Sequence, residues 1–102
     1  MTFEETPFDV VVNNGGCRMS GEIVGDCALA MSAKLHQLAA AKGPVGLDVD
    51  LRGVSFIDSV GLRELLRLRQ TWPTIRVVAV SQRVHRRLVL TGTAELLLEA
   101  DA

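Results

Sequence analysis

The sequence predicts a small α/β domain with a mixed sheet, in which an N-terminal β-hairpin precedes two strand–helix units with helices packed against the sheet. The strong turn signal Asn13-Asn14-Gly15-Gly16 separates two apolar, strand-like runs. Farther along, short apolar runs twice precede segments of helical spacing, which favours parallel strands joined by helical crossovers. With 102 residues, 48% hydrophobic and 23% charged, the chain has the size and composition of one folded domain over residues 1–102.

The first half of the chain supplies the hairpin and one helix. The hairpin strands are expected over Phe8–Val12 and Cys17–Ile23, because the first run is β-branched and the second alternates between two faces. Asp26 has the residue type and position of a helix N-cap. Apolar residues then recur at helical spacing: Ala28, Met31, Leu35, Leu38 and Ala39. Gly43-Pro44 is expected to end this helix.

The second half repeats a strand followed by a helix. Alternating residues from Val45 to Leu51 predict a strand, followed by a short apolar loop. The other expected elements are a helix over Ser59–Gln70 ended by Trp72-Pro73, a strand over Ile75–Val80 and a basic helix marked by Val84 and Leu88. The tail from Ala94 to Ala102 fits either a short strand or a helical turn.

Charge and composition bear on compartment and partners. Eleven Lys and Arg nearly balance twelve Asp and Glu. The chain therefore has little net positive potential to attract nucleic acid or anionic lipid. The arginines of the later helices, including Arg63, Arg83 and Arg87, are therefore interpreted as solvated surface, some of which could meet acidic residues of a protein partner. No apolar run is long enough to span a bilayer and the N-terminus is acidic, so a cytoplasmic protein without membrane contact is expected. Nothing demands more than a monomer.

Cysteine and histidine usage predicts no metal site. Cys17 and Cys27 are expected to be reduced thiols, because the chain lacks a secretory context. His36 and His85 lie far from them in sequence, so ligand spacing is missing. No cofactor motif is present, including the G-x-x-x-x-G-K-[ST] phosphate cradle.

Ser59 is the residue with the most open interpretation. Either Asp58 or Ser59 fits the N-cap of the following helix, which is the commonest task of these residue types. A nucleophile is disfavoured, because Ile57-Asp58-Ser59-Val60-Gly61 lacks the G-x-S-x-G elbow and no base is placed beside it. Phosphorylation is physically reasonable, since a helix N-terminus stabilises the added charge. It would turn an apolar patch, expected to be exposed around Val60 and Leu62, into an anionic one.

The segment from Asp50 to Leu62 resembles the STAS domains of anti-sigma factor antagonists. The matching residues are Asp50-Leu51, Gly53-Val54, Phe56-Ile57-Asp58-Ser59 and Gly61-Leu62. Gly21-Glu22-Ile23 and the stretch from Val84 to Gly92 are similar to flanking parts of the family pattern. The chain departs from that pattern at Val60, where many members have a second serine, and at Val24, where relatives often have aspartate.

The resemblance implies a STAS-like fold and a non-enzymatic binding module with a switch at Ser59. In the family, the unphosphorylated antagonist binds an anti-sigma factor that is a serine kinase of the GHKL type, and a sigma factor is released. Phosphorylation of the serine ends binding, and a PP2C-type phosphatase restores it. By position, Asp58 would present the hydroxyl and Gly61 would allow close approach. The implied partner-binding residues are Asp26, Asp58, Ser59, Val60, Gly61, Leu62 and Arg63.

A second hypothesis stays open. A STAS domain can be a non-switching subunit or ligand-binding component of a lipid-transport or stress-sensing complex, and Ser59 would then be an ordinary cap. The adjacent Asp58 and Ser59 favour the first hypothesis, since a pure scaffold needs no phosphoacceptor.

Overall fold

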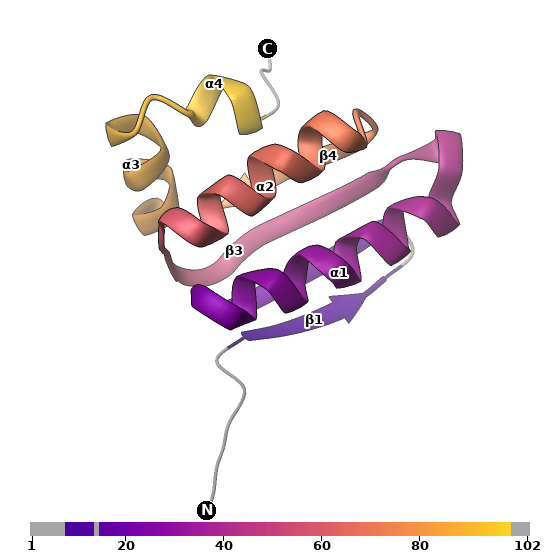
Figure 1. Cartoon of the computed structure of the whole chain (residues 1–102), viewed down its shortest axis with the longest axis horizontal. Coiled ribbons are helices and arrows are strands. Elements are labelled where there is room, and N and C mark those ends of the chain that lie inside the picture. Colours follow the sequence, from indigo (N-terminus) through magenta and orange to yellow (C-terminus); the bar gives the residue numbers. More distant parts are fainter. Residues whose placement is uncertain (1–7, 14, 99–102) are drawn as a thin grey trace, which may run out of the picture.

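A mixed sheet of four strands lies at the centre of the structure, a computed structural model that describes residues 8–13 and 15–98 (Figure 1). Its strands, in spatial order, are β1 (Phe8–Val12), β2 (Gly16–Ile23), β3 (Leu47–Ile57) and β4 (Ile75–Val80). β1 pairs with β2 in antiparallel fashion, whereas β2–β3 and β3–β4 are parallel. The predicted hairpin and the two parallel crossovers are therefore confirmed; Asn14 of the turn lies outside the described residues.

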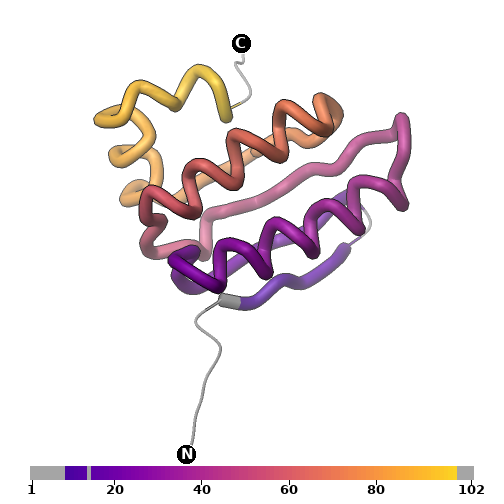
Figure 2. The backbone as a smooth tube through the Cα atoms, in the orientation of Figure 1, coloured from indigo at the N-terminus to yellow at the C-terminus, as the bar shows by residue number. Residues whose placement is uncertain are grey.

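The two longest helices, α1 (Gly25–Lys42) and α2 (Ser59–Thr71), lie side by side over the sheet (Figures 1 and 2). The shorter α3 (Gln82–Leu90) lies beside the junction of β3 and α2, and α4 (Ala94–Leu97) packs on α2 and α3. In the described part of the chain, no helix is both long and apolar enough to cross a membrane.

β3 differs from the predicted strand at both ends. Val45 belongs to a turn of 3-10 helix, η1 (Gly43–Val45), and is exposed, because the chain turns sharply through Gly46 at a φ of +91° before β3 begins. At the other end β3 continues six residues beyond Leu51, to Ile57. The segment expected to be a loop is a strand because β2 pairs with it, up to the pair Ile23–Ile57.

The core lies between the helical layer and the sheet. β3 contributes the buried Leu47, Val49 and Leu51, and α1 and α2 cover them with apolar faces. The fully or almost fully buried residues of these helices are Ala28, Met31, Leu35, Ala39, Leu62, Leu65 and Leu68. The helical face predicted for α1 is thus confirmed, with Leu38 half-buried against the same core. Burial of this apolar surface is the main favourable term in folding.

The tail combines the two alternatives left open by the sequence. Ala94–Leu97 forms the short helix α4, and Leu98 then makes an isolated parallel bridge with Val77 of β4. The Arg69 guanidinium donates a hydrogen bond to the Leu97 carbonyl at 3.0 Å, which ties this segment to α2. Residues 99–102 lie outside the described part.

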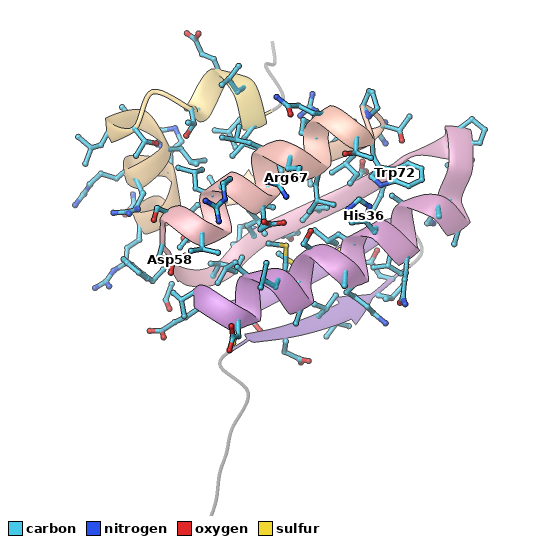
Figure 3. The ribbon with its side chains drawn as sticks, in the orientation of Figure 1. His36, Asp58, Arg67 and Trp72 are labelled. Carbon is cyan, nitrogen blue, oxygen red and sulfur yellow. The ribbon has the colours of Figure 1, made fainter. Side chains whose placement is uncertain are left out.

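A hydrogen bond between two rings joins the end of α2 to α1. The indole Nε1 of Trp72 donates to Nδ1 of His36 at 2.7 Å, and the rings meet edge to face (Figure 3). His36 Nδ1 therefore carries no proton in this arrangement. Trp72, expected only to be the apolar end of a helix, also fixes the relative position of the two helices.

Replacing His36 tests this bond. We expect His36→Leu to lower the free energy of unfolding by about 1 kcal/mol, because it removes the acceptor of the Trp72 N–H. His36→Gln is the matched control, since glutamine has a similar helix propensity and can supply an acceptor oxygen. Urea unfolding followed by circular dichroism measures both, and equal stabilities of the two variants would contradict a role for the bond.

Candidate functional site

The carboxylate of Asp58 caps two helices at once. Asp58 follows β3, and its Oδ1 accepts a hydrogen bond from the Gly61 N–H at 2.8 Å in the first turn of α2. Its Oδ2 accepts from the N–H of Gly25, the first residue of α1, at 3.1 Å. A negative charge at a helix N-terminus is stabilised by the helix dipole, and here two N-termini share one carboxylate. The starts of α1 and α2 are thereby held together (Figures 1 and 3).

Gly61 brings the start of α2 against the end of β2. A Cβ atom at Gly61 would lie 2.6 Å from the Ile23 carbonyl oxygen and 2.8 Å from Cγ1 of Ile57. The Asp58 N–H also donates to the Ile23 carbonyl, at 3.2 Å. Only glycine fits at position 61 without displacing backbone, so the close approach expected there occurs within the fold, against β2.

Ser59 is the first residue of α2 and is exposed. Its hydroxyl makes no hydrogen bond to any residue that the structure describes. The choice between Asp58 and Ser59 as the helix cap is therefore resolved in favour of Asp58. The Ser59 hydroxyl is left accessible at the positive end of α2.

Asp26 is not the N-cap of α1, in contrast to the sequence prediction. Val24 occupies that position without a side-chain hydrogen bond, and Asp26 is the exposed second residue of the helix. The helix starts earlier than expected because the Gly25 N–H finds its acceptor in Asp58, on another element. Asp26 remains favourable in the first turn of α1. Since Gly25 and Ser59 both adjoin the Asp58 carboxylate, Asp26 and Ser59 belong to the same corner of the molecule.

The prediction that Leu62 is exposed in an apolar patch at the start of α2 is wrong. Leu62 is buried and belongs to the core, and Val60 is half-buried. Arg63 is exposed on the same helix. The exposed apolar side chains of the neighbouring elements are instead Phe56 of β3 and Leu29 of α1. Sequence reasoning missed Phe56 because the alternation of buried residues in β3 changes phase after Leu51, where two successive residues face solvent.

The buried thiol of Cys17, at the start of β2, is chemically quiet. Burial, together with the negative charge of Asp50, raises the pKa of the Cys17 thiol to about 11, so it stays protonated at neutral pH. Hydrogen bonds from the Arg52 side chain hold the pKa of the Asp50 carboxyl below its ordinary value of 3.8. Both cysteines are free. Over residues 8–13 and 15–98, no three His, Cys, Asp or Glu side chains come together in a way that could hold a metal ion.

Comparison with known proteins defines the family. Residues 9–100 match the family model of the STAS domain, and the chain belongs to this family. An anti-sigma factor antagonist from Mycobacterium paratuberculosis is 28% identical in sequence, with a TM-score of 0.74 over 88% of this chain and 82% of that chain. The unphosphorylated form of the anti-sigma factor antagonist SpoIIAA is 17% identical, with a TM-score of 0.64 over 92% of this chain and 88% of that one, and shows the shared fold. Among curated proteins, none matches this chain significantly.

Asp58→Ala is expected to lower the free energy of unfolding by about 2 kcal/mol, because two helix N-termini lose their acceptor. Asp58→Asn keeps one acceptor oxygen but loses the charge, so its cost should be smaller. Urea unfolding compares the two, and amide exchange at Gly25 should accelerate in both. Asp26→Ala is the matched control. A loss there as large as in Asp58→Ala would contradict the double cap.

The two cysteines should differ in reactivity. We expect iodoacetamide to modify the half-buried Cys27 first at pH 8, and Cys17 only on unfolding, because the thiolate is the reactive form and the pKa of Cys17 is raised. Intact mass over time measures the order, and Cys27→Ser is the control that should leave native protein unmodified. Equal rates at both thiols would contradict the burial of Cys17.

Proposed function

We propose that this STAS domain is an anti-sigma factor antagonist controlled by phosphorylation of Ser59. The unphosphorylated protein would bind an anti-sigma factor that is a GHKL-type serine kinase and so release a sigma factor. Transfer of a phosphoryl group from ATP to Ser59 would end binding, and a PP2C-type phosphatase would restore it. Family membership and the likeness to an anti-sigma factor antagonist at 28% identity support this proposal.

The observation that carries the proposal is the free, exposed hydroxyl of Ser59 beside a capping carboxylate. Because Asp58 performs the capping, modification of Ser59 need not remove a hydrogen bond on which the fold depends. A phosphate adds a charge of about −1.5 to −2 at neutral pH. It would stand next to the Asp58 carboxylate, so the corner becomes strongly anionic while the fold is retained. Such a change acts on the surface that a partner meets.

The residues around Ser59 take different parts in this proposal. Asp58 would orient the hydroxyl by fixing the first turn of α2, and Gly61 would keep that turn against β2. Asp26, Val60 and Arg63 would contact the partner, since each is at least partly exposed at the start of α1 or α2. Leu62 is buried, so it would not contact the partner itself but would support the first turn of α2 from the core.

The same proposal gives the protein no catalysis and no cofactor of its own. It acts as a monomeric binding module in the cytoplasm, and the chemistry at Ser59 belongs to the kinase and the phosphatase. Nucleic acid is not a partner in this scheme, since the chain has a formal net charge of −1.

Variants of Ser59 test the switch against a cognate anti-sigma kinase. Ser59→Ala should bind the kinase persistently in the presence of ATP, because it cannot be phosphorylated. Ser59→Asp should bind at least about ten-fold more weakly than wild type, because it places a second carboxylate beside Asp58. Calorimetry measures affinity, and intact mass with site mapping measures modification.

Gln70→Glu is the matched charge control, since this exposed position lies at the far end of α2 from Ser59. It should bind like wild type. Labelling of another residue while Ser59 stays unmodified would refute the proposed site. If Ser59→Asp bound as tightly as wild type, the charge argument would fail. A wild-type protein that is never modified and binds no anti-sigma kinase would favour the non-switching STAS subunit.

A further inference from the structure

A small pocket lies between the end of β3 and α3, next to the segment that carries Ser59. Its volume is about 210 Å³. The residues that matter are Phe56 and Ile57 of β3 with Arg83, Arg86, Arg87 and Leu90 of α3. No acidic side chain lines it. The lining is mainly apolar, to which the three arginines contribute their side-chain stems, and the helix that borders the pocket carries three permanent positive charges.

The arrangement of these arginines is unfavourable for the isolated domain. Arg83 lies three residues before Arg86 and four before Arg87 on one helix, spacings at which like charges repel. Arg83 also lies in the first turn of α3, near the positive end of the helix dipole. α3 itself contains no acidic residue, and across the described chain none of the three arginines forms an ion pair. A bound anion would relieve this repulsion.

Arg87 is held against the wall of the pocket by an aromatic ring. Its Nε is buried and has no hydrogen-bond partner within the described residues. Its guanidinium carbon lies 5.5 Å from the centre of the Phe56 ring, so the aromatic ring holds the cation at the pocket. A buried donor without an acceptor is costly, and the planar guanidinium matches the geometry of phosphate and carboxylate.

The apolar lining defines the rest of the ligand. Phe56 is 42% exposed and Leu90 is 78% exposed, values that leave apolar surface uncovered at the pocket. Pockets for drug-sized ligands are roughly 300 to 1,000 Å³, whereas an apolar cavity of about 150 Å³ accommodates benzene. At about 210 Å³ this pocket fits one ring or a short alkyl chain. A nucleic acid would need a longer basic track than three arginines on one helix.

We propose that this pocket binds a small organic anion, in which a phosphate or carboxylate is attached to a single ring or a short alkyl chain. The body would lie in the apolar hollow on Phe56 and Leu90. The charged head would stand at the mouth, within reach of the exposed Arg83 and Arg86 and of Arg87 on the same helix. Binding at this pocket does not require phosphorylation of Ser59. The pocket residue Ile57 and Ser59 are two residues apart in the chain, so the pocket and the proposed phosphorylation site are neighbours.

Titration of the full, isotope-labelled chain followed by NMR and calorimetry tests the site. The probes are phenyl phosphate and phenylacetate, with inorganic phosphate and phenol as the separate halves. At least one of the two intact probes should bind five-fold or more tighter than either half, with shifts centred on Phe56 and residues 83–90. The tighter of phenyl phosphate and phenylacetate identifies the head group. Failure of both would overturn the proposal.

Arg87→Gln should weaken the preferred probe roughly ten-fold, because a charge-assisted hydrogen bond is lost. Arg83→Gln, at an exposed position, should weaken it as well and serves if Arg87→Gln fails to fold. Arg18→Gln is the matched control, since it removes one exposed arginine from β2. Equal weakening in all three variants would overturn the proposal. So would tighter binding of the acidic peptide acetyl-Glu-Phe-Glu-amide than of either probe, since the occupant would then be a protein segment.

Discussion

The carboxylate of Asp58 is the interaction on which the rest of this structure depends. It accepts hydrogen bonds from the first residue of α1 and from the first turn of α2, which would otherwise be two separate helix ends with unpaired N–H groups. The same corner is closed by the contact of Gly61 with the end of β2. Two helices and the ends of two parallel strands therefore meet at one side chain.

This constraint explains how the phosphorylation proposed at Ser59 would add charge without changing the fold. Asp58 occupies the capping position, so the neighbouring Ser59 has no structural hydrogen bond to lose within the described chain. Asp58 thus serves the fold, and the adjacent Ser59 is left for the proposed phosphorylation. The pocket that Arg83, Arg86 and Arg87 help to line lies at the same end of β3, where Phe56 and Ile57 form its wall. A ligand there would meet a surface made by the same strand end.

Periodicity was sufficient for most of the elements. A β-branched run, a turn signal and an alternating run predicted the hairpin, and a short apolar run predicted β4. Helical spacing predicted α1 and α2. Each of these signals depends on neighbours within a few residues. The family motif also led directly to Asp58 and Ser59. Predictions failed where the outcome depended on distant pairing: β3 extends to Ile57 because β2 pairs with it, and Leu62 is buried because α2 lies on the sheet.

The sequence by itself determined the strand–helix order and the apolar face of α1, since these follow from local spacing and residue type. It also singled out Ser59 as the serine proposed for modification. Only the tertiary structure decided that Asp58, and not Asp26, serves the start of α1, because acceptor and donor are 33 residues apart. The same holds for the Trp72–His36 bond and for the pocket between β3 and α3. Such contacts depend on how separate elements pack, and no local pattern records that geometry.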